Sequence, residues 1–389
     1  MKLFLLLLTM WIVASFVVVP SYVFASASVS DTHAEEETTH HHHDDKSEVH
    51  TEESHNHVHK HHHGGHMPAG VMFGHMLDQA GDFMFGYRLM IGRQGGDVLH
   101  GTHKASDHAI INLGCSDTIK CGSAPSKMNM KMHMINMMYA PTNWMNLMVM
   151  PTFVDMNMDV RGLSGGAGHG GGHGHAGIST HSTGGVGDTT IASMFELYDS
   201  PGHWLHLGLG FSAPTGNVGV KFKNNGHAAG GLVHFGMQLG SGTWDFMPSL
   251  TYTGEHNRWS WGAQLSGTKR MEDQNKSGYR LGDMFQATTW GGYRFMRNFS
   301  VTLRGIYTVQ GAIHGDFNTF NARTGPMDFP ANHGGQFWDI GIGLNAVFPR
   351  GILHDHTLSV EWLQPMQDDV NGYRLERKPA FALTWNYTF

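Results

Sequence analysis

Large apolar side chains alternate with small or polar ones along many short stretches of this chain. In the last stretch, 379–389, every second residue from Phe381 to Phe389 is large and apolar, and the residues between them are small or polar. Alternation with a period of two predicts a strand whose two faces meet different surroundings. A terminal strand of this kind is typical of a transmembrane β-barrel, in which lipid-facing and lumen-facing residues alternate. The alternative is the last strand of a soluble β-sandwich.

The same alternation recurs along the chain and predicts about twelve strands. Long connections such as 159–188 alternate with short ones such as 141–143, which is typical of a barrel with short periplasmic turns and long outer loops. The predicted fold class is therefore all-β: a transmembrane antiparallel up-and-down β-barrel with both of its ends in the periplasm. The expected strands are 82–91, 128–140, 144–158, 189–199, 203–213, 243–254, 257–268, 283–295, 298–310, 336–348, 355–365 and 379–389.

The first 66 residues lack this alternation. Lys2, an apolar run and the small residues Ala25 and Ala27 predict a secretory signal peptide over 1–27, with an uncleaved anchor as the alternative. Residues 28–66 are rich in histidine and acids, which predicts a disordered periplasmic tail. Residues 67–389 then form the barrel, which we expect in the cell outer membrane, surrounded by lipid. Its C-terminal strand resembles the signal that the barrel-insertion machinery reads.

Composition excludes one class of partner and predicts one covalent link. The formal net charge of −7 arises mainly in 31–66, which hold nine acids and two lysines, so no basic face is left for nucleic acid. The mean hydropathy of −0.28 fits a barrel with a wet lumen. Cys115 and Cys121 follow a signal peptide, so we predict an oxidising compartment and a disulfide, with a thiolate metal site as the alternative.

Histidine and methionine are the candidate metal ligands. Neutral imidazole binds borderline metals, and thioether sulfur favours Cu(I). We expect no required cofactor, but Cu, Zn, Ni or Co ions bound by the histidine-rich tail. The alternatives are a solvated spacer for the tail and a flexible apolar filler for the methionines. The candidate metal-binding residues are His40, His41, His42, His43, His55, His57, His59, His61, His62, His63, Met148, Met150, His169, His173 and His175.

Alternation also assigns residues to the lumen. On 128–140, polarity places the row containing Lys131 and His133 in the lumen and the methionine row toward lipid; on 144–158, Met148 and Met150 are expected inside. Both signs of charge occur in the expected lumen, so strong ion selectivity is not predicted. The residues expected to line the lumen or pore are Arg88, His133, Glu196, His206, Asp245, Gln264, Arg304, Asp339 and Glu361.

Four motifs resemble those of a known family. They begin at Ala140, Gly185, Gly210 and Gln238 and read APTNWM, GVGD, GFSAPTG and QLGSGTWD. With them, the chain from about residue 75 to its end resembles the outer-membrane transporters grouped under the name "meta-pathway of phenol degradation". The resemblance implies an envelope barrel thought to pass small molecules, and it supplies no catalytic residues. The histidine-rich tail and the methionine rows resemble a metal-associated branch of this family.

Three functions are compatible with these features. The first is an outer-membrane channel, narrow or plugged, that passes small molecules or metal ions and is linked to the handling of copper or other transition metals. The second is a metal-sequestering envelope protein in which the tail binds metal and the barrel is only an anchor. The third is a membrane enzyme such as a barrel phospholipase. That function needs a Ser–His pair near a rim, and no such pair has a recognisable spacing, so we do not expect an enzyme.

Overall fold

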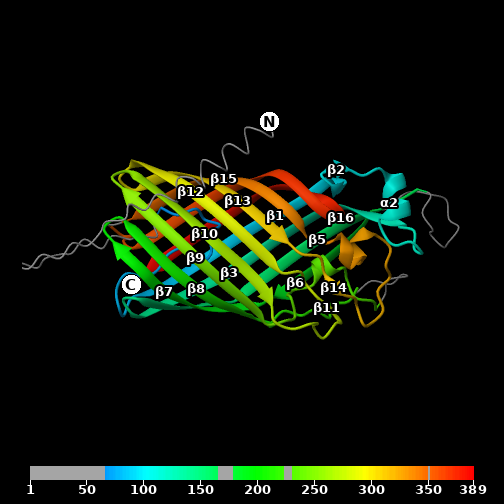
Figure 1. Ribbon diagram of the computed structural model, residues 1–389, viewed down its shortest axis with the longest axis horizontal. Coiled ribbons are helices and arrows are strands. Elements are labelled where there is room, and N and C mark those ends of the chain that lie inside the picture. Colours follow the sequence, from blue (N-terminus) through cyan, green and yellow to red (C-terminus); the bar gives the residue numbers. More distant parts are fainter. Residues whose placement is uncertain (1–65, 165–177, 223–229, 349–350) are drawn as a thin grey trace, which may run out of the picture. The chain divides into compact units, whose positions relative to one another are not determined.

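A computed structural model describes residues 66–164, 178–222, 230–348 and 351–389. The predicted signal peptide, the tail up to residue 65, and the loop histidines His169, His173 and His175 lie outside the described residues. The described part forms one fourteen-stranded sheet, of which eleven strands close into a ring with antiparallel pairs only (Figure 1). No helix in these ranges is long and apolar enough to cross a membrane. The all-β closed antiparallel barrel is thus confirmed.

The strands of the ring follow one another in chain order, as in an up-and-down barrel. The first strand closes the ring by pairing with the next ring strand on one side and with the last strand on the other. The ring consists of β1 (Phe83–Gly101), β3 (Ser123–Thr142), β4 (Met145–Met150), β7 (Thr189–Ser200), β8 (His203–Ala213), β9 (Asp245–His256), β10 (Trp259–Arg270), β12 (Met284–Met296), β13 (Phe299–Gln310), β15 (Gly335–Phe348) and β16 (His356–Thr388).

Three further strands extend this wall. β2 (His103–Lys104) pairs with the end of β1, β5 (Thr152–Gly162) pairs with β3, and β6 (Ile178–Val186) pairs with β5. The predicted strand 144–158 is divided into β4 and β5 at Pro151, because proline has no N–H to donate to a ladder. β6 was not predicted, since it lies in a glycine-rich connection where the apolar alternation is absent.

The ring has eleven labelled strands where about twelve were predicted, because the last two predicted strands both fall within β16. Residues 356–370 of β16 pair with β15, and residues 370–388 pair with β1. The element turns back on itself: the N–H of Thr388 donates to the carbonyl of Asp355 (3.2 Å), and the rings of His356 and Tyr387 stack at 4.6 Å. Gly372, with φ of +58°, lies at the bend. β16 therefore supplies two antiparallel passes, as a ring of antiparallel pairs requires.

The two faces of the wall have the alternating character that the sequence predicts. On β13, Leu303 is 60% exposed on the outer face, whereas Thr302 and Arg304 beside it are 1% and 3% exposed. On β4, Leu147 is 42% exposed and Met148 only 3%. An outer face covered by exposed large apolar side chains is what lipid requires of a barrel. The inner face is buried by residues that lie inside the ring.

One predicted orientation is wrong. On β3, the methionine row and not the polar row faces the lumen: Met134 is 2% exposed and packs in one cluster with Phe73 and Met148. His133 therefore lies on the outer face, where its Nδ1 is 2.7 Å from the hydroxyl of Tyr87. The prediction failed because it treated the lumen as uniformly wet, whereas the lumen beside β3 is filled by apolar side chains.

Short connections and the C-terminus lie at one end of the barrel, and the long connections gather at the other (Figure 1). We call the latter the loop end. The elements found there are α2 (Asp107–Leu113), η1 (Phe235–Met237), β11 (Tyr279–Arg280), β14 (His314–Gly315), η2 (Pro326–Asp328) and η3 (Pro330–Asn332). None of these was predicted, because they depend on contacts between loops.

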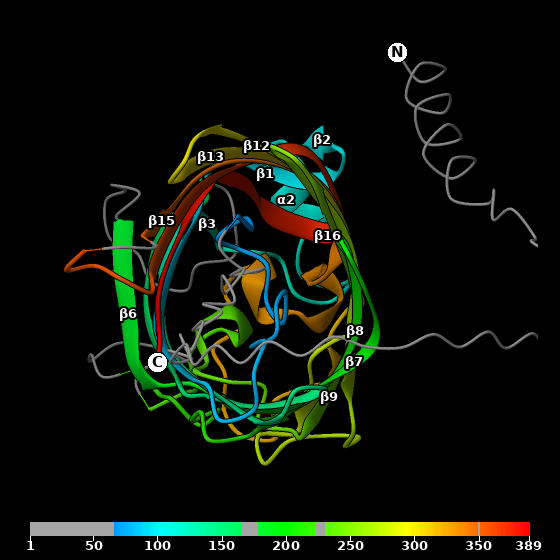
Figure 2. The ribbon, with the colours of Figure 1, turned by 90° about the vertical axis from the view of Figure 1, so that its left-hand side faces the viewer.

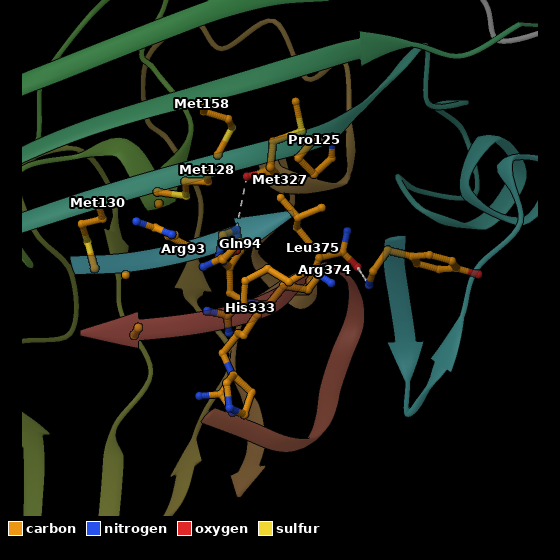
Figure 3. A pocket seen from close by; sticks show the side chains of 18 of the residues that line it. Arg93, Gln94, Pro125, Met128, Met130, Met158, Met327, His333, Arg374 and Leu375 are labelled. Atoms are coloured by element: carbon orange, nitrogen blue, oxygen red, sulfur yellow. Dashed lines mark hydrogen bonds between the residues drawn. The ribbon is translucent and has the colours of Figure 1, made fainter. Parts of the chain in front are cut away.

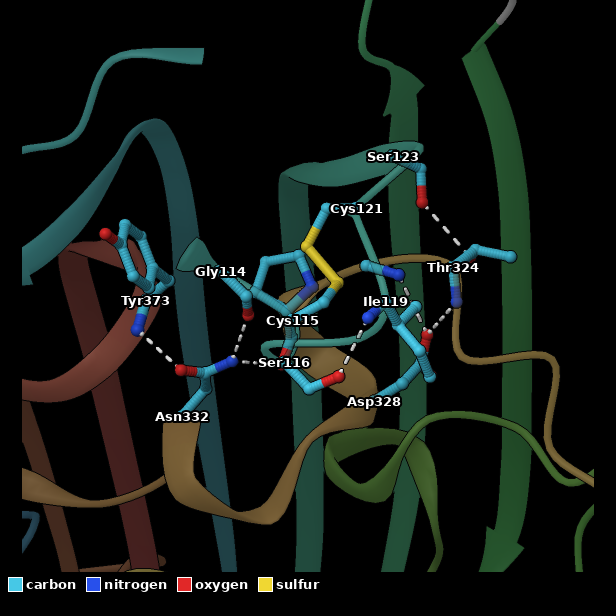
Figure 4. Close-up of a disulfide and its surroundings, with 12 residues drawn as sticks. Gly114, Cys115, Ser116, Ile119, Cys121, Ser123, Thr324, Asp328, Asn332 and Tyr373 are labelled. Carbon is cyan, nitrogen blue, oxygen red and sulfur yellow. Dashed lines mark hydrogen bonds between the residues drawn. A yellow bond between two sulfur atoms is a disulfide. The ribbon is translucent and has the colours of Figure 1, made fainter. Parts of the chain in front are cut away.

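The two cysteines form the predicted disulfide, which joins Cys115 to Cys121 in the connection after α2 (Figure 4). The connection 311–334 packs against it. The side-chain amide of Asn332 donates to the carbonyl of Gly114 (2.7 Å), and its oxygen accepts from the N–H of Tyr373 (2.9 Å). One amide thus joins the disulfide connection, the 311–334 connection and β16 at the loop end.

Candidate functional site: the barrel lumen

Residues 66–82, which we call the inner segment, lie inside the ring before the chain enters β1 (Figure 2, dark blue). Side chains from strands all around the ring bond to this segment's backbone, so the placement does not depend on one contact. The donors and acceptors lie on β1, β4, β8, β9, β10 and β16. This arrangement could not be predicted from the sequence, because the segment has neither strand alternation nor a helical period.

Buried polar side chains hold the carbonyl groups in the middle of the inner segment. The carbonyl of Phe73 accepts from Nε2 of His206 at 2.7 Å and from the hydroxyl of Thr251 at 3.4 Å. The side-chain amide of Gln264 donates to the carbonyl of Met72 at 2.7 Å. A buried backbone carbonyl without a partner would cost free energy, so these donors fix where the segment can lie.

A buried ion pair holds the segment nearer its start. Nε of Arg304 donates to Oε1 of Glu361 at 2.8 Å, and the other oxygen of Glu361 accepts from the N–H of Gly70, also at 2.8 Å. A Cβ atom at Gly70 would lie 2.6 Å from Nη2 of Arg304 and 2.9 Å from Glu361. Glycine is therefore needed here for the backbone to approach the pair.

Arg88 and Asn146 also bind backbone groups of the inner segment. Nη2 of Arg88 donates to the carbonyl of Val71 (2.9 Å), and Nε donates to the hydroxyl of Thr384 (3.1 Å). Toward β1, the N–H of Leu77 donates to the side-chain oxygen of Asn146, which is fully buried. Polar lumen residues thus serve as partners for backbone groups, and not as the walls of an open aqueous path.

On the side of β1, β3 and β4 the inner segment meets apolar side chains. Phe73 and Leu77 form a cluster with methionines and alanines of the wall. The buried methionines of this cluster are Met84, Met134, Met138, Met148, Met150 and Met194. We call this side, together with β7, the methionine wall, and we call the side formed by β8 to β16 the polar wall.

A cavity of about 370 Å³, the large cavity, lies at the loop end of the lumen (Figure 3). Met128, Met130 and Met158 lie along one side, and Arg374 and His333 lie opposite. Its volume falls within the range of ligand sites for small molecules. Its lining combines soft apolar groups with cations, so the cavity suits a molecule with an apolar body and a polar or anionic group.

The charges of the large cavity are only partly balanced. Arg377 is paired with both Asp339 and Asp368, at 2.8 and 2.7 Å. Arg374 forms no ion pair among the described residues; its guanidinium lies over the ring of Phe337, 5.3 Å from the ring centre. The guanidinium of Arg374 also donates to the carbonyl of Gly334 (3.4 Å), but no carboxylate offsets its charge, so it can attract an anionic group.

His333 links this cavity to the connection 311–334. It lies before β15, and Nε2 donates to the carbonyl of Met327 at 3.2 Å. Burial lowers the pKa of His333 to about 4, and the positive charge of Arg374 acts in the same direction. His333 is thus neutral at neutral pH, and protonation would oppose the packing of this connection.

A second cavity, of about 90 Å³, lies between the inner segment and strands β7 and β8. His75 and Asp78 of the inner segment line it, together with Glu196 and His206 of the wall. The inner segment lies between this small cavity and the large one. These two spaces of the lumen are therefore on different sides of one chain segment.

The structure places the predicted lumen residues as follows. Apart from His133, all lie on the inner face. Arg88, His206, Gln264 and Glu361 contact the inner segment directly, and Arg304 does so through Glu361. Asp245 pairs with Arg270, Asp339 lines the large cavity, and Glu196 lines the small one. Their part in transport stays a prediction, as does metal binding by Met148 and Met150.

The comparisons with known proteins agree with a closed β-barrel. The chain belongs to the family described as "Putative MetA-pathway of phenol degradation", whose model matches residues 136–350, more than half of the 389 residues. The family resemblance seen in the sequence is thus confirmed, although the match does not distinguish a metal-associated branch. No curated protein matches the chain.

Among solved structures, an outer-membrane channel from Pseudomonas putida F1 shares the fold, with a TM-score of 0.50, 14% identity, and coverage of 82% of this chain and 98% of that one. A deletion mutant of the monoaromatic hydrocarbon channel TodX gives a TM-score of 0.41, 9% identity, and coverage of 80% and 91%. A FadL homologue from Pseudomonas aeruginosa gives 0.38, 11%, and coverage of 80% and 90%. The first of these supports the barrel fold.

Proposed function

We propose that this chain is an outer-membrane channel for small molecules, and that the inner segment closes the lumen in the conformation seen in the structure. Three observations support the proposal: the ring is closed, its outer face is apolar, and the fold is shared with an outer-membrane channel. A closed ring without a free edge satisfies its backbone groups in lipid. Its proposed partners are outer-membrane lipid, the barrel-insertion machinery and the solute.

The observation that carries the proposal is the way in which the lumen is blocked. One stretch of chain, 66–82, separates the large cavity from the small one, and side-chain hydrogen bonds and packing hold it there without a covalent bond. A typical intramolecular hydrogen bond contributes only about 0.5–1.5 kcal/mol net. No single contact of this kind would prevent a conformational change from displacing the inner segment. Its displacement would join the two cavities.

The lining of the large cavity indicates the class of solute. Thioether side chains form one part of it, and Arg374 supplies a cation that has no carboxylate partner among the described residues. Flexible methionine side chains adapt to ligands of different shape. We therefore propose solutes with an apolar body, with or without an anionic group.

Conductance across a planar bilayer tests this function. The double variant H206A/Q264A removes two donors to the inner segment, and we expect a higher open probability than in the wild-type channel. Thr288→Val is the matched control, because its buried hydroxyl donates to the carbonyl of Gly305 and not to the inner segment. Absence of conductance in all three proteins, each correctly inserted, would refute the channel.

The link to copper or other metals is a second proposal, more specific than the channel function. Among the described residues, no group of three or more His, Cys, Asp or Glu side chains could hold a metal ion. Binding by the tail is supported only by its sequence, and so is the alternative that the barrel merely anchors the tail. Deletion of 28–65 followed by measurement of bound Cu and Zn separates these functions, since an unchanged stoichiometry would exclude the tail.

A further inference from the structure

Three arginines that face the lumen donate to backbone carbonyls and form no ion pair among the described residues. Other arginines of the lumen bind carboxylates, as Arg304 binds Glu361. A charge taken out of water is usually paired, because an unpaired charge loses its hydration without compensation. We call these three the carbonyl-bound arginines: Arg374 donates to Gly334 at 3.4 Å, Arg88 to Val71 at 2.9 Å, and Arg294 to Asn257 at 2.5 Å.

The carbonyl-bound arginines lie at successive levels of the lumen. Arg374 lines the large cavity at the loop end (Figure 3), and Arg88 binds the inner segment. Arg294 lies near the end of β12, before the short β12–β13 connection, on the same face as the buried Trp290. A solute that crosses the lumen from the loop end would therefore meet a guanidinium at the entrance, in the middle and at the exit.

Cations exceed acids on the lining of the large cavity. Arg377 is paired with two carboxylates, and Lys378 is paired with Glu376 at 2.9 Å. Arg374 and Arg93 line the same cavity and form no ion pair among the described residues. An anion in this cavity would thus meet two cations whose charges no carboxylate offsets.

In the middle of the lumen, two guanidinium groups share one carboxylate. Glu361 is paired with Arg304, and Arg88 lies near enough to both for their charges to interact. The space beside Arg88 has a volume of about 10 Å³, which is close to the least that holds one water molecule. A solute anion can therefore reach Arg88 only in place of the inner segment.

The strand ends joined by the β9–β10 and β12–β13 connections carry three arginines and one acid, Glu255. Arg258 and Arg294 lie directly opposite each other, because the N–H of Arg294 donates to the carbonyl of Arg258 at 2.8 Å. The third arginine, Arg297, lies in the β12–β13 connection. Like charges directly opposite each other on neighbouring strands are unfavourable, and a bound anion would relieve their repulsion.

A group of acids lies on the other side of the inner segment. Asp78, Glu196 and Asp199 line the small cavity beside β7 and β8. An anion would be repelled there and attracted along the side of the lumen that carries Arg374, Arg88 and Arg294. The charges of the lumen are therefore separated by sign, and not mixed at random.

We propose that the solutes of this channel are organic anions with an apolar body, whose carboxylate first binds Arg374 and then replaces the carbonyl of Val71 at Arg88. A carboxylate can accept two parallel hydrogen bonds from one guanidinium, which a single carbonyl cannot match. The anion thereby favours the displaced position of the inner segment, because it binds Arg88 only in that state. The step at Arg88 rests on the proposed channel function, whereas binding at Arg374 does not.

Titration calorimetry of the full chain in detergent, with hexanoate and hexanamide as probes, tests Arg374. The two probes share an apolar chain and differ in charge. We expect hexanoate to bind more tightly, and Arg374→Gln to lower its affinity about 10- to 100-fold, as loss of a charged hydrogen-bond partner does. The affinity for hexanamide should stay the same.

Lys378→Gln is the matched control, because Lys378 lines the same cavity but its charge is already offset by Glu376. The loss of hexanoate affinity should be smaller than in Arg374→Gln. Equal affinities of the wild-type protein for the two probes, or equal losses in the two variants, would overturn the assignment of Arg374.

Conductance across a planar bilayer tests Arg88. Hexanoate should raise the open probability of the wild-type protein, and hexanamide should not. Arg88→Gln should abolish this difference between the probes, and Arg88→Lys should keep part of it, because lysine retains the charge but not the planar fork of donors.

His206→Ala is the matched control, because it removes another donor to the inner segment and leaves the charge of Arg88 in place. It should still distinguish the two probes. A difference that persists in Arg88→Gln, or that disappears in His206→Ala, would overturn the role of Arg88.

The two measurements separate this inference from the channel function. Conductance that does not distinguish hexanoate from hexanamide would refute the preference for anions and leave the channel. Binding of hexanoate that depends on Arg374, without conductance in any of the inserted proteins, would refute the channel and leave the anion site.

Discussion

The two walls of the lumen hold the same inner segment by different forces. The polar wall bonds to its backbone groups, through Gln264 and Glu361, for example, at fixed distances and directions. The methionine wall packs against its side chains Phe73 and Leu77 without directional bonds. Hydrogen bonds specify one position, whereas flexible thioethers tolerate several. The comparison indicates that the polar wall sets the register of the segment and that the methionine wall lets it move.

The largest effect is expected from the buried ion pair of the polar wall. Glu361→Ala leaves the guanidinium of Arg304 buried and unpaired, and we expect the free energy of unfolding to fall by about 3–5 kcal/mol. Urea unfolding of the protein in lipid vesicles measures this free energy. Glu376→Ala is the control: its partner Lys378 is partly exposed, so the loss should be about 0–1 kcal/mol. Equal losses in the two variants would contradict the account.

The loss of stability caused by a substitution on the methionine wall should depend on the volume of the new side chain and not on its chemistry. Met134→Ala creates a cavity in the cluster and should cost about 2–5 kcal/mol. Met134→Leu keeps the volume and should cost less than about 1.5 kcal/mol. The same unfolding measurement distinguishes the two variants. A large loss in Met134→Leu would show that this wall is as specific as the polar wall.

Loss of a single donor from the polar wall should loosen the inner segment and spare the barrel. His206→Ala removes the shortest bond to the carbonyl of Phe73, and leaving that acceptor poorly satisfied should cost about 1–3 kcal/mol. Hydrogen exchange of residues 66–82 should rise, and exchange of the strands should not. A uniform rise over the whole chain would mean that His206 supports the barrel itself.

The smallest effect is expected from acid at the loop end, where neither wall dominates. Because its pKa lies below that of an exposed histidine, His333 stabilises the packed connection fully above about pH 6.5 and progressively less as the pH falls toward 4. Limited proteolysis within 311–334 should therefore accelerate from pH 7 to pH 5. The titratable and charged groups that face His333 are Arg374, Asp328 and His234. His333→Gln should abolish this dependence; if the acceleration persists, another group is responsible.

The barrel and the family could both be predicted from the amino-acid sequence alone. Strict alternation, as on β13 and β15, has one physical cause, a wall between lipid and an interior, so each predicted strand overlaps an observed one. Four short motifs were enough to recognise the family. Alternation and short motifs each involve residues that are close together in the chain, so they can be recognised in a single sequence.

The residues that fill the interior could not be predicted from the sequence, because contacts between distant parts of the chain place them there. Residues 66–82 carry no period of their own, because their conformation is set by partners as distant in the sequence as Glu361 and Thr384. For the same reason the orientation of β3 was wrong: whether Met134 or His133 faces inward depends on whether Phe73 or water occupies the lumen. Alternation shows that two faces differ, but the contents of the lumen decide which face is which.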